Sequence, residues 1–302
     1  MIKKYNGVVV PMITPFTEKG EIDSAAVVRI CQNFVKNGVS PFVLGTTGES
    51  SSVSPEDSQL VAEMAVKATD RKVLVYAGIS DNCVNQNIKR AKTYFDLGID
   101  VIVSVLPNYY PLTSKQMYDY YNAIADSSSC PVMIYNIPST TNMSIPLDIV
   151  QKLSEHPNIC GFKDSERNEQ RMEECIKMFY EREDFSYFVG CAKFSAISLK
   201  KGADGIVPST ANFTPKMFRQ LYDFSIAKEW DEAERLQNET NEIAQIYQGG
   251  RTLGQSLSAL KTMMSVIGLC SPYTILPLTT SSVDEQSVII AATKEILKRY
   301  PI

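Results

Sequence analysis

The sequence predicts an α/β protein, a (β/α)8 TIM barrel with a C-terminal helical extension. Short runs of Val, Ile and aromatic residues alternate with amphipathic stretches, and the runs are apolar throughout instead of at every second position. Strands that are buried on both faces have this continuous apolar character, and a closed parallel barrel buries every strand in that way. A doubly wound open sheet is the alternative, but the chain has no GxGxxG fingerprint after its first run or elsewhere.

The expected strands are eight short apolar runs, each bounded by turn-forming residues. In chain order they are GVVVPMIT (7–14), PFVLGTT (41–47), KVLVYAG (72–78), DVIVSVLP (100–107), PVMIYNIP (131–138), NICGFKD (158–164), SYFVGC (186–191) and DGIVPST (204–210). Their length and their enrichment in β-branched and aromatic residues favour strands over buried helices.

Between these runs lie stretches that begin with Ser and carry apolar residues at helical spacing, such as residues 24–38, 54–70 and 114–128. Several stretches end on a glycine before the chain returns to the next run. Gly38, Gly98 and Gly202 occupy these positions. We interpret them as left-handed residues at helix ends, which completes a βα order throughout.

After about residue 225 the strand pattern stops, and residues 226–248, 252–269 and 283–300 have helical patterns. No linker rich in Pro, Gly or Ser separates this part from the preceding one. We therefore expect a barrel over residues 1–224 and a three-helix extension over residues 225–302 that packs on the barrel.

The composition excludes several classes of function. A formal charge of −4 with 21% charged residues gives no electrostatic support for a nucleic-acid partner. No apolar run is long enough to cross a bilayer, and Pro11 and Pro15 interrupt the segment where a secretory signal would continue, so we expect a cytoplasmic protein without a membrane partner. One histidine and seven widely spaced cysteines without a CxxC pair predict neither a metal site nor a disulfide framework.

The carboxyl ends of barrel strands are where a site is expected, because the βα loops converge there. These ends carry Thr46, Thr47, Gly48, Tyr109, Tyr135 and Lys163. Each has a structural explanation of its own: Tyr135 as a core aromatic, Lys163 reaching solvent, and the loop as an ordinary turn with Glu49 as an acceptor. Their common position on one rim favours a site in which an amine, phenols, hydroxyls and backbone N–H groups act together.

The motifs GTTGE (45–49), YNIP (135–138) and GFKDS (161–165) resemble the dihydrodipicolinate synthase and N-acetylneuraminate lyase family, the pyruvate-dependent class I aldolases. The likeness extends from the first strand through GADGIVPSTAN at 202–212 and into the helical tail. It implies that Lys163 forms a Schiff base with pyruvate. The chemistry agrees, because an iminium accepts the electrons of the adjacent C–C bond and because burial favours the neutral, nucleophilic amine.

By the same resemblance, Tyr135 donates and accepts protons, and Thr46 connects Tyr135 to Tyr109 in a proton relay. The family's tyrosine at the Tyr109 position comes from a neighbouring subunit, which implies at least a dimer, with a homotetramer as the usual form. Thr47 and the N–H groups of its turn, Gly48 included, would hold the carboxylate of pyruvate. Val207 would face the bound pyruvyl group, and neither a metal nor another cofactor is needed.

The resemblance leaves the aldehyde partner open. The family's synthases hold the carboxylate of aspartate semialdehyde with an arginine two residues after the YNxP proline, but Thr140 stands there and cannot form a bidentate clamp. The family's sialate lyases use acidic residues after the seventh strand, where this chain has Ala192 and Lys193.

We therefore favour an aldolase or lyase of 2-keto-3-deoxy sugar acids or related 2-oxo acids. An atypical dihydrodipicolinate synthase and a catalytically silent barrel that binds 2-oxo acids are the alternatives. Lys193 either points to solvent or binds a distal anion of the aldehyde.

Overall fold

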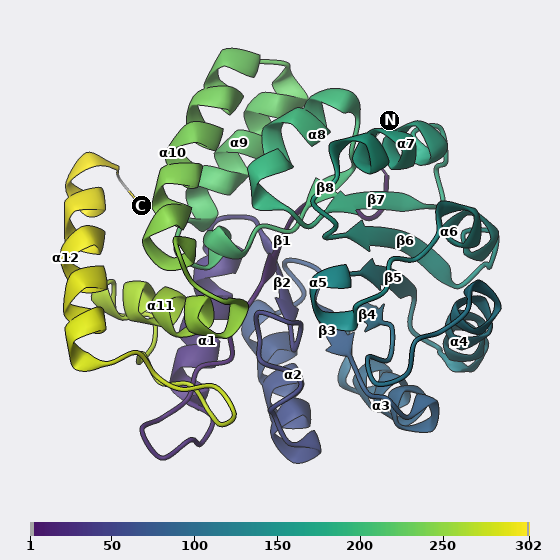
Figure 1. Cartoon of the computed structure of the whole chain (residues 1–302), viewed down its shortest axis with the longest axis horizontal. Coiled ribbons are helices and arrows are strands. Elements are labelled where there is room, and N and C mark those ends of the chain that lie inside the picture. Colours follow the sequence, from purple (N-terminus) through teal and green to yellow (C-terminus); the bar gives the residue numbers. More distant parts are fainter. Residues whose placement is uncertain (1–2, 301) are drawn as a thin grey trace.

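The computed structural model describes residues 3–300 and residue 302. Its parallel strands form a closed barrel in chain order, β1 to β8, with β8 pairing to β1 (Figure 1). The strands are β1 (Gly7–Pro11), β2 (Ser40–Val43), β3 (Tyr76–Ile79), β4 (Val101–Val105), β5 (Val132–Asn136), β6 (Ile159–Asp164), β7 (Ser186–Val189) and β8 (Gly205–Ile206). The predicted TIM barrel is confirmed, and the open sheet is excluded because both edges are paired.

Helices surround the strands, as Figure 1 shows. They are α1 (Ser24–Lys36), α2 (Pro55–Thr69), α3 (Val84–Leu97), α4 (Ser114–Ser127), α5 (Pro138–Thr141), α6 (Leu147–Leu153), α7 (Glu169–Phe179), α8 (Ser195–Lys201), α9 (Pro215–Ala227), α10 (Trp230–Gln248), α11 (Leu253–Val266) and α12 (Val283–Arg299), with the 3₁₀ turns η1 (Ala192–Phe194) and η2 (Ser209–Asn212). At least one helix follows each strand, which confirms the alternation that the sequence predicts.

Local signals explain where these helices begin and end. The Asp23 side chain accepts from the Ala26 N–H at the start of α1, and Thr113 forms a reciprocal capping box with Gln116 at the start of α4. Gly98 and Gly202 end α3 and α8 in the left-handed region, with φ of 94° and 107°. A side chain would be strained in that conformation, so the glycines fix the turns into the next strands.

Two layers of apolar side chains hold the barrel together. The larger core lies between strands and helices, and a smaller cluster fills the barrel interior. Val9, Phe42, Val103, Met133 and Phe188 belong to the interior cluster. This packed interior leaves the chemistry to the side chains at its carboxyl-end rim.

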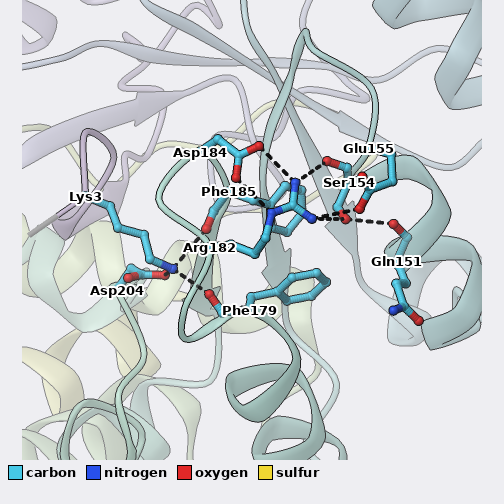
Figure 2. A network of polar contacts seen from close by, with 9 residues as sticks. All are labelled: Lys3, Gln151, Ser154, Glu155, Phe179, Arg182, Asp184, Phe185 and Asp204. Carbon is cyan, nitrogen blue, oxygen red and sulfur yellow. Dashed lines mark hydrogen bonds and ion pairs between the residues drawn. The ribbon is translucent and has the colours of Figure 1, made fainter. Parts of the chain in front are cut away.

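A polar network lies at the amino ends of the strands, with the buried ammonium group of Lys3 on one side and the more exposed pair of Arg182 and Asp184 on the other (Figure 2). The Lys3 ammonium group donates to the carbonyl oxygens of Phe179 (2.8 Å) and Phe185 (2.9 Å) and to the carboxylate of Asp204 (2.8 Å). Arg182 binds the neighbouring Asp184 carboxylate in the same view. Lys3 precedes β1, Asp184 and Phe185 precede β7, and Asp204 precedes β8, so these contacts stabilise the end of the barrel that is opposite the expected site.

The C-terminal helices gather on one side of the barrel (Figure 1). Helix α9, which follows β8, continues to Ala227 and therefore crosses the boundary that we placed after residue 224. Helix α10 packs on α8 and α9, and α11 and α12 pack on α10. Within the described residues, no helix combines the length and the apolar character that a membrane crossing requires.

Candidate active site

Lys163 lies at the carboxyl end of β6 and is only 4% exposed. Its neighbours in the strand register are Tyr135 on β5 and Phe188 on β7. The Nζ atom lies 3.2 Å from the centroid of the Tyr135 ring and 5.4 Å from that of the Phe42 ring. Burial lowers the pKa of Lys163 well below its usual value, and the nearby Asp164 carboxylate opposes that shift. The site therefore favours a neutral amine at a strand end.

Tyr135 is buried beside this amine, and its hydroxyl oxygen lies 3.3 Å from Oγ1 of Thr46. Burial raises the pKa of Tyr135, and the hydrogen bond with Thr46 lowers it. The phenol therefore holds its proton at neutral pH, and its hydrogen-bond partner is a second hydroxyl through which a proton can move.

The turn after β2 positions Thr46 and Thr47. Its ends, Leu44 and Glu49, are in the left-handed region with φ of 58° and 55°. The Gly48 N–H donates to the Gly45 carbonyl oxygen (3.0 Å) inside the turn, and a Cβ on Gly48 would lie 3.0 Å from the Met12 carbonyl oxygen. Gly48 thus shapes the turn, while Thr47 lines the cavity.

A buried ion pair holds this turn against the C-terminal extension. The carboxylate of Glu49 accepts from the ammonium group of Lys261 on α11, and both side chains are 0% exposed. Lys261 also donates to the Tyr273 carbonyl oxygen (2.9 Å), and its Nζ lies 4.4 Å from the centroid of the Phe16 ring. Burial raises the pKa of Glu49 and lowers that of Lys261, and the attraction between the two charges opposes both shifts.

A second polar network lies behind Lys163 and joins the GFKDS and YNIP segments. The Asp164 carboxylate accepts from the Asn136 amide (2.8 Å), from Nε of Arg171 (2.7 Å) and from the Glu166 N–H (2.9 Å). Burial raises the pKa of Asp164, and the Arg171 charge lowers it. This network fixes the loop after β6, and therefore the position of Glu166 on the rim.

A cavity of about 1010 Å³ opens above these side chains. Residues that line its inner part include Thr46, Thr47, Tyr135, Lys163 and Val207. Residues that line its outer part include Glu166, Arg167, Lys193, Asn241, Gln245, Gln248 and Arg251. The cavity therefore extends from the carboxyl ends of the strands, where Lys163 lies, to the polar face of α10.

The structure brings most of the predicted site residues together in this cavity. Lys193 lies in η1 and lines the cavity, although its side chain is exposed. Tyr109 is the exception, because it is 76% exposed and does not line the cavity of its own chain. Its ring packs edge-on against that of Tyr110, with 4.8 Å between the ring centroids. Of the three hydroxyl groups of the predicted relay, only those of Thr46 and Tyr135 lie within hydrogen-bond distance of each other in the described chain.

Sequence reasoning missed the residues that α10 and the following loop contribute. Asn241, Gln245 and Gln248 lie on one face of α10 at helical spacing, and Arg251 follows that helix. Their spacing in the sequence is a usable signal of a polar face. What the sequence does not show is that this face covers the barrel mouth, because that depends on how α10 packs on α8 and α9.

Fold and site together define a TIM-barrel lyase of the class I aldolase type. The chain belongs to the dihydrodipicolinate synthetase family, whose model matches residues 4–296.

Named relatives agree with this assignment over nearly the full length. The chain is 29% identical to 4-hydroxy-tetrahydrodipicolinate synthase of Campylobacter jejuni (strain 81-176), with 98% of this chain and 97% of that protein covered. It is 27% identical to an uncharacterized DapA-like lyase of Thermofilum pendens, with 98% and 99% covered. The structure of dihydrodipicolinate synthase from Bacteroides thetaiotaomicron matches with a TM-score of 0.92 and 28% identity over 99% of this chain and 100% of that one.

Proposed function

We propose that Lys163 forms a Schiff base with pyruvate and that the enzyme makes or cleaves a 2-keto-3-deoxy sugar acid. One observation carries the proposal: Lys163, next to last in β6, is 4% exposed, and its Nζ lies 3.2 Å from the centroid of the Tyr135 ring. Because burial penalises the ammonium form, the amine is available as a nucleophile at neutral pH.

In the proposed reaction, the Lys163 nitrogen attacks C2 of pyruvate, and a proton moves from this nitrogen to the ketone oxygen. Tyr135 then donates its proton, that oxygen leaves as water, and the nitrogen lone pair forms the C=N bond of the iminium. The Tyr135 phenolate removes a proton from C3, and the resulting enamine attacks the aldehyde carbon. The aldehyde oxygen takes the proton back from Tyr135.

Hydrolysis completes the cycle. The Tyr135 phenolate takes a proton from water as this water adds to the iminium carbon. The proton of the new hydroxyl group then moves to the nitrogen, the C–N bond breaks as the C=O bond forms, and the 2-oxo acid and the free Lys163 amine are released. Cleavage runs through the same steps in reverse. In both directions Oγ1 of Thr46 lies 3.3 Å from the Tyr135 oxygen. The Thr46 hydroxyl can therefore donate a hydrogen bond to the Tyr135 phenolate after the phenol has given up its proton.

Two features support a hydroxylated aldehyde as the second substrate. Thr140 replaces the arginine with which the family's synthases hold aspartate semialdehyde. The amide side chains of Asn241, Gln245 and Gln248 line the outer cavity, and amides both donate to and accept from hydroxyl groups. An atypical dihydrodipicolinate synthase is the second candidate, because relatives such as the Campylobacter jejuni protein carry that name.

The test compares the two reactions on one preparation. Cleavage of 2-keto-3-deoxygluconate is followed by release of pyruvate, and synthesis from pyruvate and aspartate semialdehyde is followed by formation of the cyclic product. Lys163→Met serves as the inactive control. We expect pyruvate release that depends on Lys163. Efficient cyclic product would favour the synthase, and a pyruvate adduct without turnover of either kind would favour a silent binding barrel.

The role that we propose for Tyr109 depends on the assembly of several protomers. We propose a homotetramer in which Tyr109 of one protomer extends the relay of a neighbouring one, since an exposed stacked pair of tyrosines suits an interface. A cytoplasmic location is also part of the proposal, and the free state of all seven cysteines supports a reducing compartment.

A further inference from the structure

The outer part of the cavity is lined by basic side chains from separate segments. Arg167 follows β6, Lys193 lies in η1 after β7, and Arg251 lies between α10 and α11. Among the described residues that line the cavity, Glu166 is the one carboxylate. The balance of these groups therefore decides the charge that a substrate meets.

Glu166 shares its cation with Asp164. Its carboxylate accepts from the Asn136 amide (3.0 Å) and the Ser144 hydroxyl (2.6 Å), and it lies 3.3 Å from Nε of Arg171. Arg171 lies outside the cavity lining and also binds the Asp164 carboxylate (2.7 Å), so one guanidinium group faces two carboxylates and compensates Glu166 only in part.

The basic groups differ in how they are held. Nε of Arg251 binds the Glu285 carboxylate (2.8 Å), and its Nη1 donates to the Ile246 carbonyl oxygen (3.0 Å), so this guanidinium is fixed and neutralised. Neither Lys193 nor Arg167 has a carboxylate within ion-pair distance in the described part of the chain. These two exposed cations outnumber the one partly compensated carboxylate of the lining, so the mouth of the cavity keeps a net positive charge.

We propose that the cavity selects aldehydes that end in an anion, a carboxylate or a phosphate, and that Lys193 and Arg167 determine this specificity. The inference rests on the proposed Schiff-base function and names its aldehyde class. Pyruvate binds at the inner end beside Lys163, so the far end of the aldehyde reaches the rim. There an ammonium and a guanidinium group can form charge-assisted hydrogen bonds with an anion and attract it during binding.

The test uses aldehydes that differ only at the far end: glyceraldehyde as the neutral one, tartronate semialdehyde with a carboxylate, and glyceraldehyde 3-phosphate with a phosphate. The ratio of kcat/KM for each anionic aldehyde to that for glyceraldehyde is measured with saturating pyruvate. Lys193→Gln and Arg167→Gln should each lower this ratio about tenfold, the range of one charge-assisted hydrogen bond. Lys92→Ala, which removes an exposed charge on α3 outside the cavity, should leave the ratio unchanged.

A wild-type enzyme without a preference for either anionic aldehyde overturns the inference, and so do variants with an unchanged ratio. A preference for only one of the two anions, lost in the variants, supports it and identifies the group. Trapping of the wild type with pyruvate and borohydride separates the two proposals. An adduct without anion preference refutes the specificity alone, whereas the absence of an adduct refutes the Schiff-base function on which it rests.

Discussion

Replacement of Lys261 by methionine should destabilise the protein strongly, because it leaves the Glu49 carboxylate buried without its cation. Both side chains are 0% exposed, and Lys261 also donates to the Tyr273 carbonyl oxygen at 2.9 Å. Breaking a buried pair on one side costs about 3–5 kcal/mol. We therefore expect Lys261→Met to lower the free energy of unfolding in urea by that amount at neutral pH.

The loss of unfolding free energy caused by Lys261→Met should also depend on pH in a defined direction. Without Lys261, burial holds the pKa of Glu49 above its unfolded value, so the folded variant binds a proton more readily than the unfolded chain does. A group of this kind stabilises the fold below its unfolded pKa and loses that contribution as pH rises through its folded pKa. The difference between Lys261→Met and the wild type should therefore grow as pH rises.

A double variant and a surface control make the experiment specific. Glu49→Gln in the Lys261→Met background removes the uncompensated charge, so the double variant should be more stable than Lys261→Met alone. Lys67→Met breaks the exposed pair with Glu63 on α2 and should cost about 0.3–0.5 kcal/mol. A cost below about 1 kcal/mol for Lys261→Met, typical of a surface pair, would refute the reasoning. A double variant that is no more stable than Lys261→Met would refute it as well.

Three further predictions concern the chemistry. Tyr135→Phe should lower turnover by about 10²–10⁴-fold while pyruvate still adds slowly, and near-normal steady-state turnover would contradict the acid–base role. Asp164→Asn should move the pH profile of adduct formation, followed by borohydride trapping, to lower pH, because the Asp164 charge raises the pKa of Lys163; an unchanged profile or a shift to higher pH would contradict this. Aspartate semialdehyde should be a poor partner, because Thr140 replaces the arginine that would hold its carboxylate and because the ammonium group beside that carboxylate is repelled by Lys193 and Arg167. Efficient formation of the cyclic product would favour the synthase instead.

The sequence is informative about the fold and the inner site for a physical reason. Parallel strand ends meet at one rim, so the strand order alone predicts that Thr46, Tyr135 and Lys163 lie together. The structure confirms this with the 3.3 Å contact between Thr46 and Tyr135. Lys193 is exposed and also lines the cavity, so its position is compatible with both alternatives that the sequence leaves open.

The remaining features depend on packing between distant segments. Glu49 and Lys261 are 212 positions apart, and nothing local in either segment indicates the partner. Arg251 reaches the cavity only because α10 packs on α8 and α9. The boundary between the barrel and the extension also differs from the one that we placed after residue 224, because helix α9 continues to Ala227 without a break. The predicted role of Tyr109 needs a neighbouring subunit, so the structure of a single chain does not include the contacts on which this role depends.

The most direct test of the account is the identity of the residue that captures pyruvate. The protein is incubated with pyruvate and borohydride, and its intact mass and peptide map are then measured. We predict one reduced adduct per chain, located on Lys163, and none in Lys163→Met. An unmodified mass, or an adduct on another lysine such as Lys193 or Lys261, would contradict the central claim that burial at the end of β6 makes Lys163 the nucleophile.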